Sequence, residues 1–244
     1  MKIQEILNST KHRPWEIPQE NWKFYQEWND AIFLHWKVEM EALKKFVPKE
    51  LEIDTFEGEP WVSLVAFTME KIRPRNLPSF PPISDFDEIN IRTYVKSNSK
   101  TGVYFLSIEG GTSLSCKLAK IISELPYRFS EMSRNENNYK SKNTEFGDKF
   151  NLNFLVGQKA ISKKPIDKWL TERYALFQDT KNSINEFEIH HLEWEVGEVE
   201  LTDLNIFYPR FSKLLKGKPN KSHYSKGVKV IAWGKNKRKK PTDN

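Results

Sequence analysis

Apolar residues gather in short runs separated by Gly, Pro or polar residues, and such runs are typical of β-strands. Strands are predicted at residues 31–38, 61–72, 86–97, 102–109, 127–132, 150–158, 174–178, 186–195 and 228–233. Helices are predicted at residues 3–9, 40–46, 112–124 and 165–172. The clearest helix is the third, because its apolar residues recur at every third or fourth position.

Three segments between these elements are predicted to be irregular. Residues 74–84 contain four prolines, which exclude a central strand and favour a long ordered loop. Residues 133–148 are polar and predict either a flexible crossing or an edge hairpin. Residues 213–225 predict a polar loop.

The order of these elements favours an α+β fold that is rich in strands. Strands and helices do not alternate regularly, which argues against a parallel α/β sheet. We therefore expect an antiparallel or mixed β-barrel with a few helices packed outside. Only 38% of the residues are hydrophobic, but an aromatic content of 13% supplies the large side chains that a core needs. No linker divides residues 1–234, so they are predicted to form one domain.

The net charge of +6 is concentrated at the C-terminus. Residues 235–244 contain five basic residues and one acidic residue, and we expect them to form a disordered basic tail. The remainder of the chain is close to neutral, so nucleic acid is not the expected partner. A nucleic-acid accessory protein acting through the tail remains a further hypothesis.

The sequence also gives an expectation about the compartment. No run reaches the roughly 20 apolar residues of a membrane helix, and the first ten residues lack the apolar run of a signal peptide. The single cysteine, Cys116, cannot form an internal disulfide, which fits a reducing compartment. We therefore expect a cytoplasmic protein with no membrane contact. The sequence leaves open whether copies of the chain form a homo-oligomer.

Four polar residues share one face of the strand predicted at 86–97, because side chains alternate along a strand. They are Glu88, Asn90, Arg92 and Tyr94. On a solvated face these residues would be unremarkable, with Glu88 and Arg92 as a weak ion pair. Inside a barrel they would line a polar site, and the charged groups would need partners. The pattern alone does not decide between the two interpretations.

The same strand carries a resemblance that extends over nearly the whole chain. Residues 88–95, E-I-N-I-R-T-Y-V, resemble the E-x-N-x-R-T-Y-V signature of the YqjF-like family of uncharacterised bacterial proteins. Further similar segments follow the same order, at residues 12–15, 54–56, 102–105, 125–127, 170–174 and 223–225. Each segment is short, but their order and spacing together make the resemblance specific.

The resemblance implies a fold similar to that of acetoacetate decarboxylase, a cone-shaped β-barrel with helices outside and a ligand site within. That enzyme uses a Schiff-base lysine in a P-K-K motif after a helix, and a neighbouring cation lowers the pKa of the lysine. Here Pro126 is followed by Tyr127 and Arg128, so the nucleophile is missing and decarboxylation by this route is not expected. Lys117 and Lys120, on the preceding helix, are expected to be solvated.

A small-molecule site inside the barrel is the leading functional hypothesis. The resemblance implies that Glu88 corresponds to a carboxylate of the decarboxylase site, where it would act as a general acid or base. Arg92 and Arg173 would bind an anionic group such as a carboxylate, whose geometry suits guanidinium. The ligand would be positioned by Asn90, Tyr94 and Tyr127. The alternative, motivated by the missing lysine, is a protein of the same fold that binds a ligand without chemistry.

Other reactive groups are interpreted as structural. His190 and His191 are neighbours on a predicted strand, so they point to opposite faces, and no metal site is predicted. Cys116 is expected to be a buried packing residue rather than a nucleophile. Gly110 and Gly111 form either an anion-binding turn or a simple tight turn before the helix. No nucleotide-binding motif is present, and no cofactor is predicted.

Overall fold

The computed structural model describes residues 2–159 and 162–240. Its strands are β1 (Phe24–Lys37), β2 (Glu52–Ile53), β3 (Thr55–Phe56), β4 (Glu59–Pro74), β5 (Phe86–Ser97), β6 (Lys100–Gly110), β7 (Tyr127–Phe129), β8 (Glu131–Asn135), β9 (Asn138–Lys142), β10 (Lys149–Lys159), β11 (Ala175–Asp179), β12 (Ser183–His190), β13 (Val196–Phe207), β14 (Lys221–Ala232) and β15 (Asn236–Lys239). Its helices are α1 (Ile3–Asn8), α2 (Met40–Leu43), α3 (Pro81–Ser84), α4 (Ser113–Ser123), α5 (Pro165–Thr171) and a single 3₁₀ turn, η1 (Pro209–Phe211). Among the described residues, no helix is both long and apolar enough to cross a bilayer.

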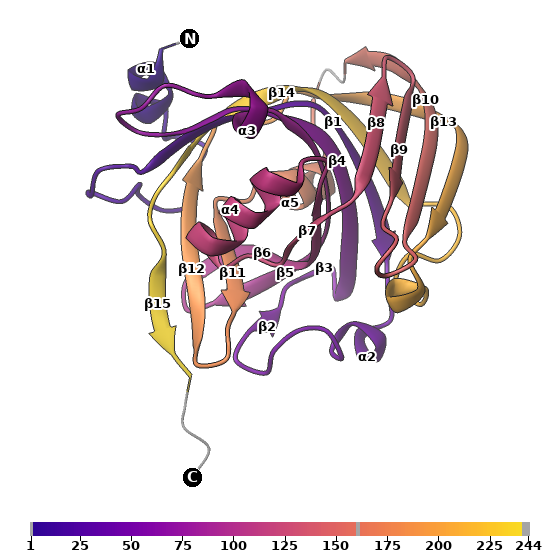
Figure 1. Cartoon of the computed structure of the whole chain (residues 1–244). Helices are drawn as coiled ribbons and strands as arrows, with labels where there is room; N and C mark the ends of the chain where they lie inside the picture. The colour runs from indigo at the N-terminus through magenta and orange to yellow at the C-terminus, as the bar shows by residue number, and fades with distance from the viewer. Residues whose placement is uncertain (1, 160–161, 241–244) are drawn as a thin grey trace.

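One mixed sheet partly closes into a ring (Figure 1). The strands of the ring follow the order β12-β11-β6-β5-β4-β1-β14. The ring closes where β14 pairs back with β12, through Ala232 opposite Ile189 and Ile231 opposite His190. The pairing of β11 with β6 is parallel and also short, whereas β4, β5, β1 and β14 pair antiparallel over long stretches. The expected mixed, strand-rich fold is confirmed, with the barrel closed only in part.

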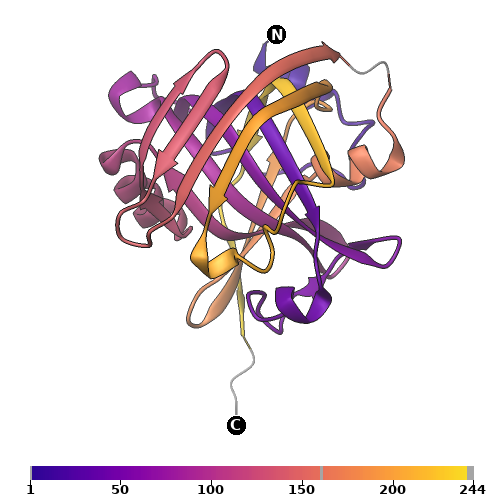
Figure 2. The same cartoon turned by 90° about the vertical axis from the view of Figure 1, so that its right-hand side faces the viewer.

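The sheet continues past β14 into β13, β10, β9 and β8, which fold back over the outer face of the ring (Figure 2). The apolar core between these two layers contains Leu34 of β1, Leu64 of β4 and Ile91 of β5, packed with Tyr139 and Phe150 from the second layer. Both faces of β5 are therefore buried. The apolar side chains of β5 face the second layer, and its polar side chains face the inside of the ring.

Several predicted segments have different bounds in the structure. The irregular segment 74–84 contains the one-turn helix α3, which two prolines begin, since a helix's first turn tolerates missing N–H groups. Residues 133–148 contain the edge hairpin β8–β9, so the second of the two interpretations is confirmed. The strand predicted at 127–132 divides into β7 and β8 around Ser130, whose N–H donates to the Gly110 carbonyl.

The helix predicted at 112–124 is present as α4, but its apolar residues are not buried as a stripe. Leu114, Ile121 and Ile122 are between 52% and 75% exposed, whereas Ser115 and Cys116 pack inward. The short helix α5 instead supplies an apolar contact to the ring. Its Leu170 is fully buried in a cluster with Tyr94 of β5 and with residues of β6 and β11.

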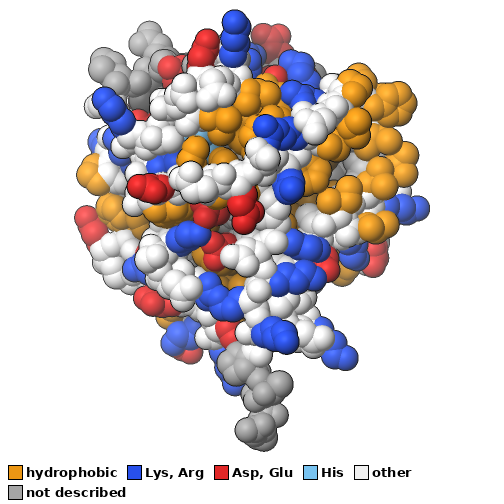
Figure 3. Space-filling model, turned by 90° about the vertical axis from the view of Figure 1, so that its left-hand side faces the viewer, with side chains coloured by type: hydrophobic (Ala, Val, Ile, Leu, Met, Phe, Trp, Pro, Cys, Tyr) orange, Lys and Arg blue, Asp and Glu red, His pale blue; other side chains and the backbone are white. Residues whose placement is uncertain are grey.

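The prediction of a disordered tail is wrong for residues 236–239, which form β15 against β12. The basic side chains are held by acidic residues of the body: Lys235 and Lys237 pair with Glu124, and Arg238 with Glu186. Figure 3 shows basic and acidic side chains interspersed on this side of the molecule. Residues 241–244 lie outside the described residues.

Candidate functional site

One buried titratable group of the ring interior is the carboxyl of Glu88 on β5, which is 3% exposed. Tyr127, at the start of β7, donates its hydroxyl to Glu88 Oε2 across 2.8 Å. The side-chain amide of Asn90 donates to Glu88 Oε1 at 3.2 Å. Burial raises the pKa of Glu88 to about 7, against the smaller lowering effect of these two hydrogen bonds and of Arg92. The group can therefore gain or lose a proton near neutral pH.

Arg92, two residues further along the same face, is buried without a carboxylate in ion-pair distance among the described residues. Its guanidinium lies over the Phe33 ring, 5.7 Å from the centroid, and contacts the hydroxyl of Tyr94. The Nε of Arg92 has no hydrogen-bond partner among the described residues. Burial lowers the pKa of Arg92, because the charged form loses hydration.

Arg173 follows α5 and enters the same region from the other side of Tyr94. Its Nη1 donates to Asp54 Oδ2 at 2.8 Å, and its guanidinium lies 4.8 Å from the Tyr94 ring and 4.4 Å from the Trp169 ring. Its Nη2 is buried without a partner among the described residues. Asp54 also pairs with Lys96 at 3.1 Å, so its charge is shared between two cations.

All six residues expected at a site are thus buried or partly buried on the ring's inner side. The hypothesis of a solvated face, with Glu88 and Arg92 as a surface ion pair, is wrong. The six residues form two adjacent groups, one around the Glu88 carboxyl and one in which two guanidinium groups flank Tyr94.

Sequence reasoning missed a hydrogen-bonded series that begins at Tyr94. The Tyr94 hydroxyl lies 2.6 Å from Ser63 Oγ, which lies 2.6 Å from His35 Nδ1. His35 Nε2 is 3.1 Å from His223 Nδ1, and His223 Nε2 is 3.0 Å from Asp167 Oδ1. The sequence signals for this series are a lone histidine within the apolar run 31–38 and the segment 223–225, which also belongs to the resemblance.

The two residues that the resemblance places at the lysines of the decarboxylase motif have different surroundings. The hydroxyl of Tyr127 donates to Glu88. Arg128 points away and pairs with Glu109 and Asp148. Lys117 and Lys120 are exposed on α4, as expected.

The remaining sequence candidates have structural contacts. His190 Nε2 bonds to the Ile6 carbonyl, and His191 Nδ1 bonds to the Leu192 carbonyl, so the two rings serve different neighbours. Among the described residues, no three His, Cys, Asp or Glu side chains gather as a metal-ligand set. Burial raises the pKa of Cys116 to about 11, and its Sγ lies 3.4 Å from the carbonyl oxygens of Gly110 and Arg128, either of which can accept its proton, so it is a packing residue.

The turn before α4 serves packing rather than anion binding. A Cβ atom at Gly110 would lie 2.6 Å from Cys116 Sγ, so only glycine fits there without a shift. The N–H of Gly111 already donates to the Asp87 carbonyl at 2.9 Å. The simple tight turn is therefore the interpretation that the contacts support.

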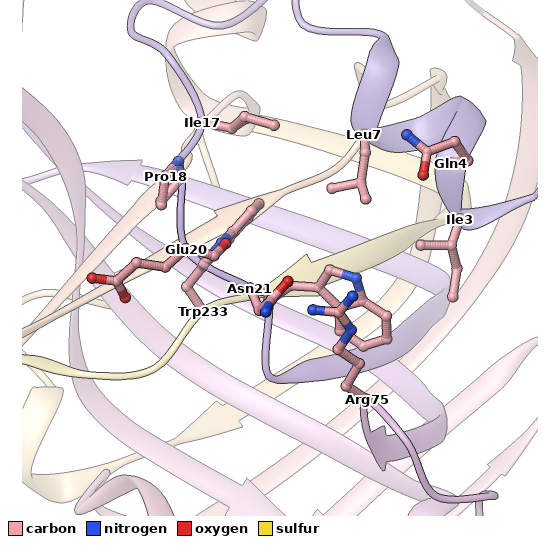
Figure 4. A pocket seen from close by; sticks show the side chains of 10 residues that line it. Ile3, Gln4, Leu7, Ile17, Pro18, Glu20, Asn21, Arg75 and Trp233 are labelled. Carbon is pink, nitrogen blue, oxygen red and sulfur yellow. The ribbon is translucent and has the colours of Figure 1, made fainter.

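A surface hollow of about 450 Å³ lies apart from this interior site (Figure 4). Residues of α1, among them Ile3 and Leu7, form one side, and the segment from Ile17 to Trp22 forms another. The guanidinium of Arg75 lies 5.2 Å from the Trp22 ring centroid at its edge. This hollow provides a comparison site for binding experiments on the interior.

Comparisons with known proteins agree with the observed architecture. Two acetoacetate decarboxylase structures, one of them from Legionella pneumophila, match with TM-scores of 0.61 and 0.62 at 15% and 12% identity, covering 98% and 97% of this chain and 98% and 95% of theirs. The enduracididine biosynthesis enzyme MppR complexed with pyruvate matches with a TM-score of 0.59 at 12% identity, over 92% of this chain and 93% of that chain. At such identities the likeness shows the fold alone.

Similarity at the sequence level is closer. The uncharacterized protein YqjF of Bacillus subtilis (strain 168) is 34% identical over 235 residues, which cover 89% of this chain and 93% of YqjF. The profile of the DUF2071 family, described as an uncharacterized conserved protein, matches residues 25–229. This range includes the whole interior site, and the chain belongs to the DUF2071 family.

Proposed function

We propose that the chain binds a small organic anion, such as an oxo carboxylate, at the polar residues inside the ring. The observation that carries the proposal is Arg92, a buried guanidinium whose Nε has no partner among the described residues. A buried charge without a counter-ion is costly to a folded protein. A ligand carboxylate would accept charge-assisted hydrogen bonds from it and supply the missing negative charge.

The local balance of charge favours an anion. Arg173 and Asp54 form a pair, and Lys96 adds a second cation to that pair. Among the described residues, the carboxyl that raises the pKa of Arg92 is Glu88, which is itself about half protonated near pH 7. The free Nη2 of Arg173 adds a second donor to the free Nε of Arg92. Two donors from neighbouring guanidinium groups suit the two oxygens of a carboxylate.

Chemistry at the same place would use Glu88. A general acid or base works best when its pKa lies near the working pH, and the pKa of Glu88 is raised to about 7. MppR, which is similar in fold, is described in complex with pyruvate, and acetoacetate decarboxylase is named for another oxo acid. Small oxo carboxylates are therefore the first ligands to test.

Binding without chemistry is a second candidate function, and Tyr127 is the observation that favours it. A phenol cannot form an imine, so the covalent route of the decarboxylase is absent at this position. A ligand that binds and is recovered unaltered after long incubation would favour this candidate, and turnover would exclude it.

The experiment is a thermal-shift series with acetate, pyruvate and acetoacetate, and with methyl pyruvate as an uncharged control. A ligand that binds the folded state raises the melting temperature by mass action. We expect a rise with the oxo carboxylates that is lost in Arg92→Gln and kept in Arg75→Gln, which alters only the surface hollow. No rise with any carboxylate, or a rise that Arg92→Gln retains, would contradict the proposal.

A further inference from the structure

The series of hydrogen bonds that starts at Tyr94 runs from strand to strand along the inner face of the ring. It passes from β5 to Ser63 on β4, to His35 on β1 and to His223 on β14, and ends at Asp167 on α5. The first four side chains come from four strands that are neighbours in the sheet. The inner end therefore lies between the two guanidinium groups. The outer end lies at a carboxylate that also pairs with Lys221, whose side chain is 28% exposed.

The acceptor at the outer end fixes the direction of the hydrogen bonds from Ser63 to Asp167. Bonds from Lys221 and from the Lys164 N–H lower the pKa of Asp167, although burial alone would raise it, so Asp167 is an acceptor only. His223 must then donate from Nε2 and accept at Nδ1. It follows that His35 donates from Nε2 to His223 and accepts at Nδ1 from the Ser63 hydroxyl.

The hydroxyl of Tyr94 has two possible acceptors. Tyr94 donates either to Ser63 Oγ at 2.6 Å or to the Leu170 carbonyl at 3.0 Å. The shorter contact completes a series in which each donor points outward, towards Asp167. Both histidines stay neutral, because burial lowers their pKa values, and His35 additionally faces His223, Arg92 and Lys221. His223 faces Lys221 and Lys163 as well as Asp167.

We propose that these five residues form a proton relay that carries a proton from a ligand in the ring to Asp167, a largely buried carboxylate that pairs with the partly exposed Lys221. This inference rests on the proposed binding of an oxo carboxylate and assigns it a reaction class, proton abstraction next to a carbonyl. The ligand C–H bond breaks, its electron pair stays on the ligand as an enolate, and its proton goes to the Tyr94 oxygen. Tyr94, Ser63, His35 and His223 each pass their own proton one step outward, and Asp167 receives the last and releases it to water.

The groups differ in their roles. Tyr94 would touch the ligand and is the proposed catalytic residue. The flanking Arg92 would stabilise the negative charge that develops on the enolate. The other four residues of the series, Ser63, His35, His223 and Asp167, act through Tyr94. His35 Nε2 and His223 Nδ1 form a hydrogen bond with each other at 3.1 Å, so neither atom can contact the ligand.

The first test needs no ligand. Nitrogen-15 NMR of the histidine side chains reports which ring nitrogen carries the proton. We expect His35 and His223, assigned by His35→Gln and His223→Gln, both to be neutral with the proton on Nε2 at pH 7. An Nδ1 proton on either ring, or a charged imidazolium, would overturn the relay even if the proposed function holds.

The second test measures exchange of the methyl protons of pyruvate in D₂O by proton NMR. We expect the protein to accelerate exchange, and Ser63→Ala and Asp167→Asn to slow it roughly 10-fold to 100-fold, within the range of general base catalysis. Asp167→Glu should restore part of the rate, and Asp203→Asn, at an exposed aspartate, should leave it unchanged. If the relay variants exchanged the protons as fast as the wild type, or if the protein bound pyruvate without accelerating exchange, the relay would be wrong. Either result would leave the proposed binding of pyruvate unaffected. Failure of the protein to bind any carboxylate would instead refute the proposed function.

Discussion

The hydroxyl of Tyr127 donates to the carboxylate of Glu88 across 2.8 Å inside the ring. In the decarboxylase motif that this segment resembles, a lysine amine would stand in place of the phenol. A phenol beside a buried carboxyl keeps a proton available without adding a positive charge. The positive charge of the interior therefore comes from the guanidinium groups of Arg92 and Arg173, which suits an anionic ligand.

The first prediction concerns pH and Glu88. Burial raises its pKa from 4.5 to about 7, so the folded state holds a proton that the unfolded chain releases between these values. The free energy of unfolding should therefore fall as the pH rises from about 4.5 to about 7. Glu88→Gln removes this dependence. Urea unfolding at pH 5 and pH 8 should show the variant gaining about 2.5 kcal/mol relative to the wild type.

The control for this experiment is Glu200→Gln, at an exposed glutamate of β13. It should run parallel to the wild type at both pH values. A Glu88→Gln variant that also ran parallel to the wild type would show that Glu88 titrates normally in the folded protein.

The second prediction is that the buried Arg92 lowers the free energy of unfolding of the ligand-free protein. Arg92 is buried without a counter-ion among the described residues, so Arg92→Met should raise the free energy of unfolding of the ligand-free protein by about 1–3 kcal/mol. Asp54→Asn should have the opposite effect, a loss of about 3–5 kcal/mol, because it leaves the buried Arg173 unpaired. Urea unfolding checks both. A loss of stability in Arg92→Met would show that the guanidinium is satisfied without a ligand.

The third prediction tests the position of Tyr127. Tyr127→Lys places an amine beside Glu88, where it can condense with a keto carbon and release water. Treatment with pyruvate and borohydride should give a reduced adduct at residue 127 in the variant and no adduct there in the wild type. Phe129→Lys, at a half-exposed position of the same strand, is the control. Peptide mapping by mass spectrometry locates the adduct. Equal labelling at residues 127 and 129 would show that the surroundings of residue 127 do not activate an amine.

The fourth prediction concerns the short parallel pairing of β6 with β11, which is part of the ring. At Gly102 on β6, a Cβ atom would lie 2.4 Å from the carbonyl oxygen of Ala175, where β6 meets β11. Gly102→Ala should lower the free energy of unfolding by about 1–3 kcal/mol, because the backbone must shift. Gly234→Ala should be close to neutral, since its nearest neighbour would lie 3.6 Å away. If Gly102→Ala and Gly234→Ala had equal effects in chemical denaturation, the backbone between β6 and β11 would be able to shift at little cost in stability.

The sequence predicted the polar face of β5 because its alternation is local. Glu88, Asn90, Arg92 and Tyr94 occupy every second position, and two-residue periodicity needs no knowledge of the fold. The periodicity could not reveal that both faces are covered. That depends on the layer of β8, β9, β10 and β13 folding back over the ring, and on pairings between residues more than a hundred positions apart.

The relay residues were missed for the same reason. Ser63 lies within a continuous apolar run, and His35 and His223 are 188 positions apart in the sequence. Their meeting follows from the antiparallel register of β1 with β4 and β14, which pairs His35 with Ser63. The strand β13 was also overlooked, although residues such as Val199 and Glu200 alternate clearly. The tail was expected to be disordered because its acidic partners, such as Glu124, lie elsewhere in the chain.

The most direct measurement of the central claim is nitrogen-15 NMR of the arginine side chains during titration with pyruvate. The Nε–H of Arg92, assigned by its loss in Arg92→Lys, has no acceptor among the described residues. A bound carboxylate should shift its proton and nitrogen signals to saturation, while the Nε–H of the exposed Arg75 stays unchanged. A saturable response of the protein to pyruvate that leaves the Arg92 signal in place would contradict an anion site in the ring.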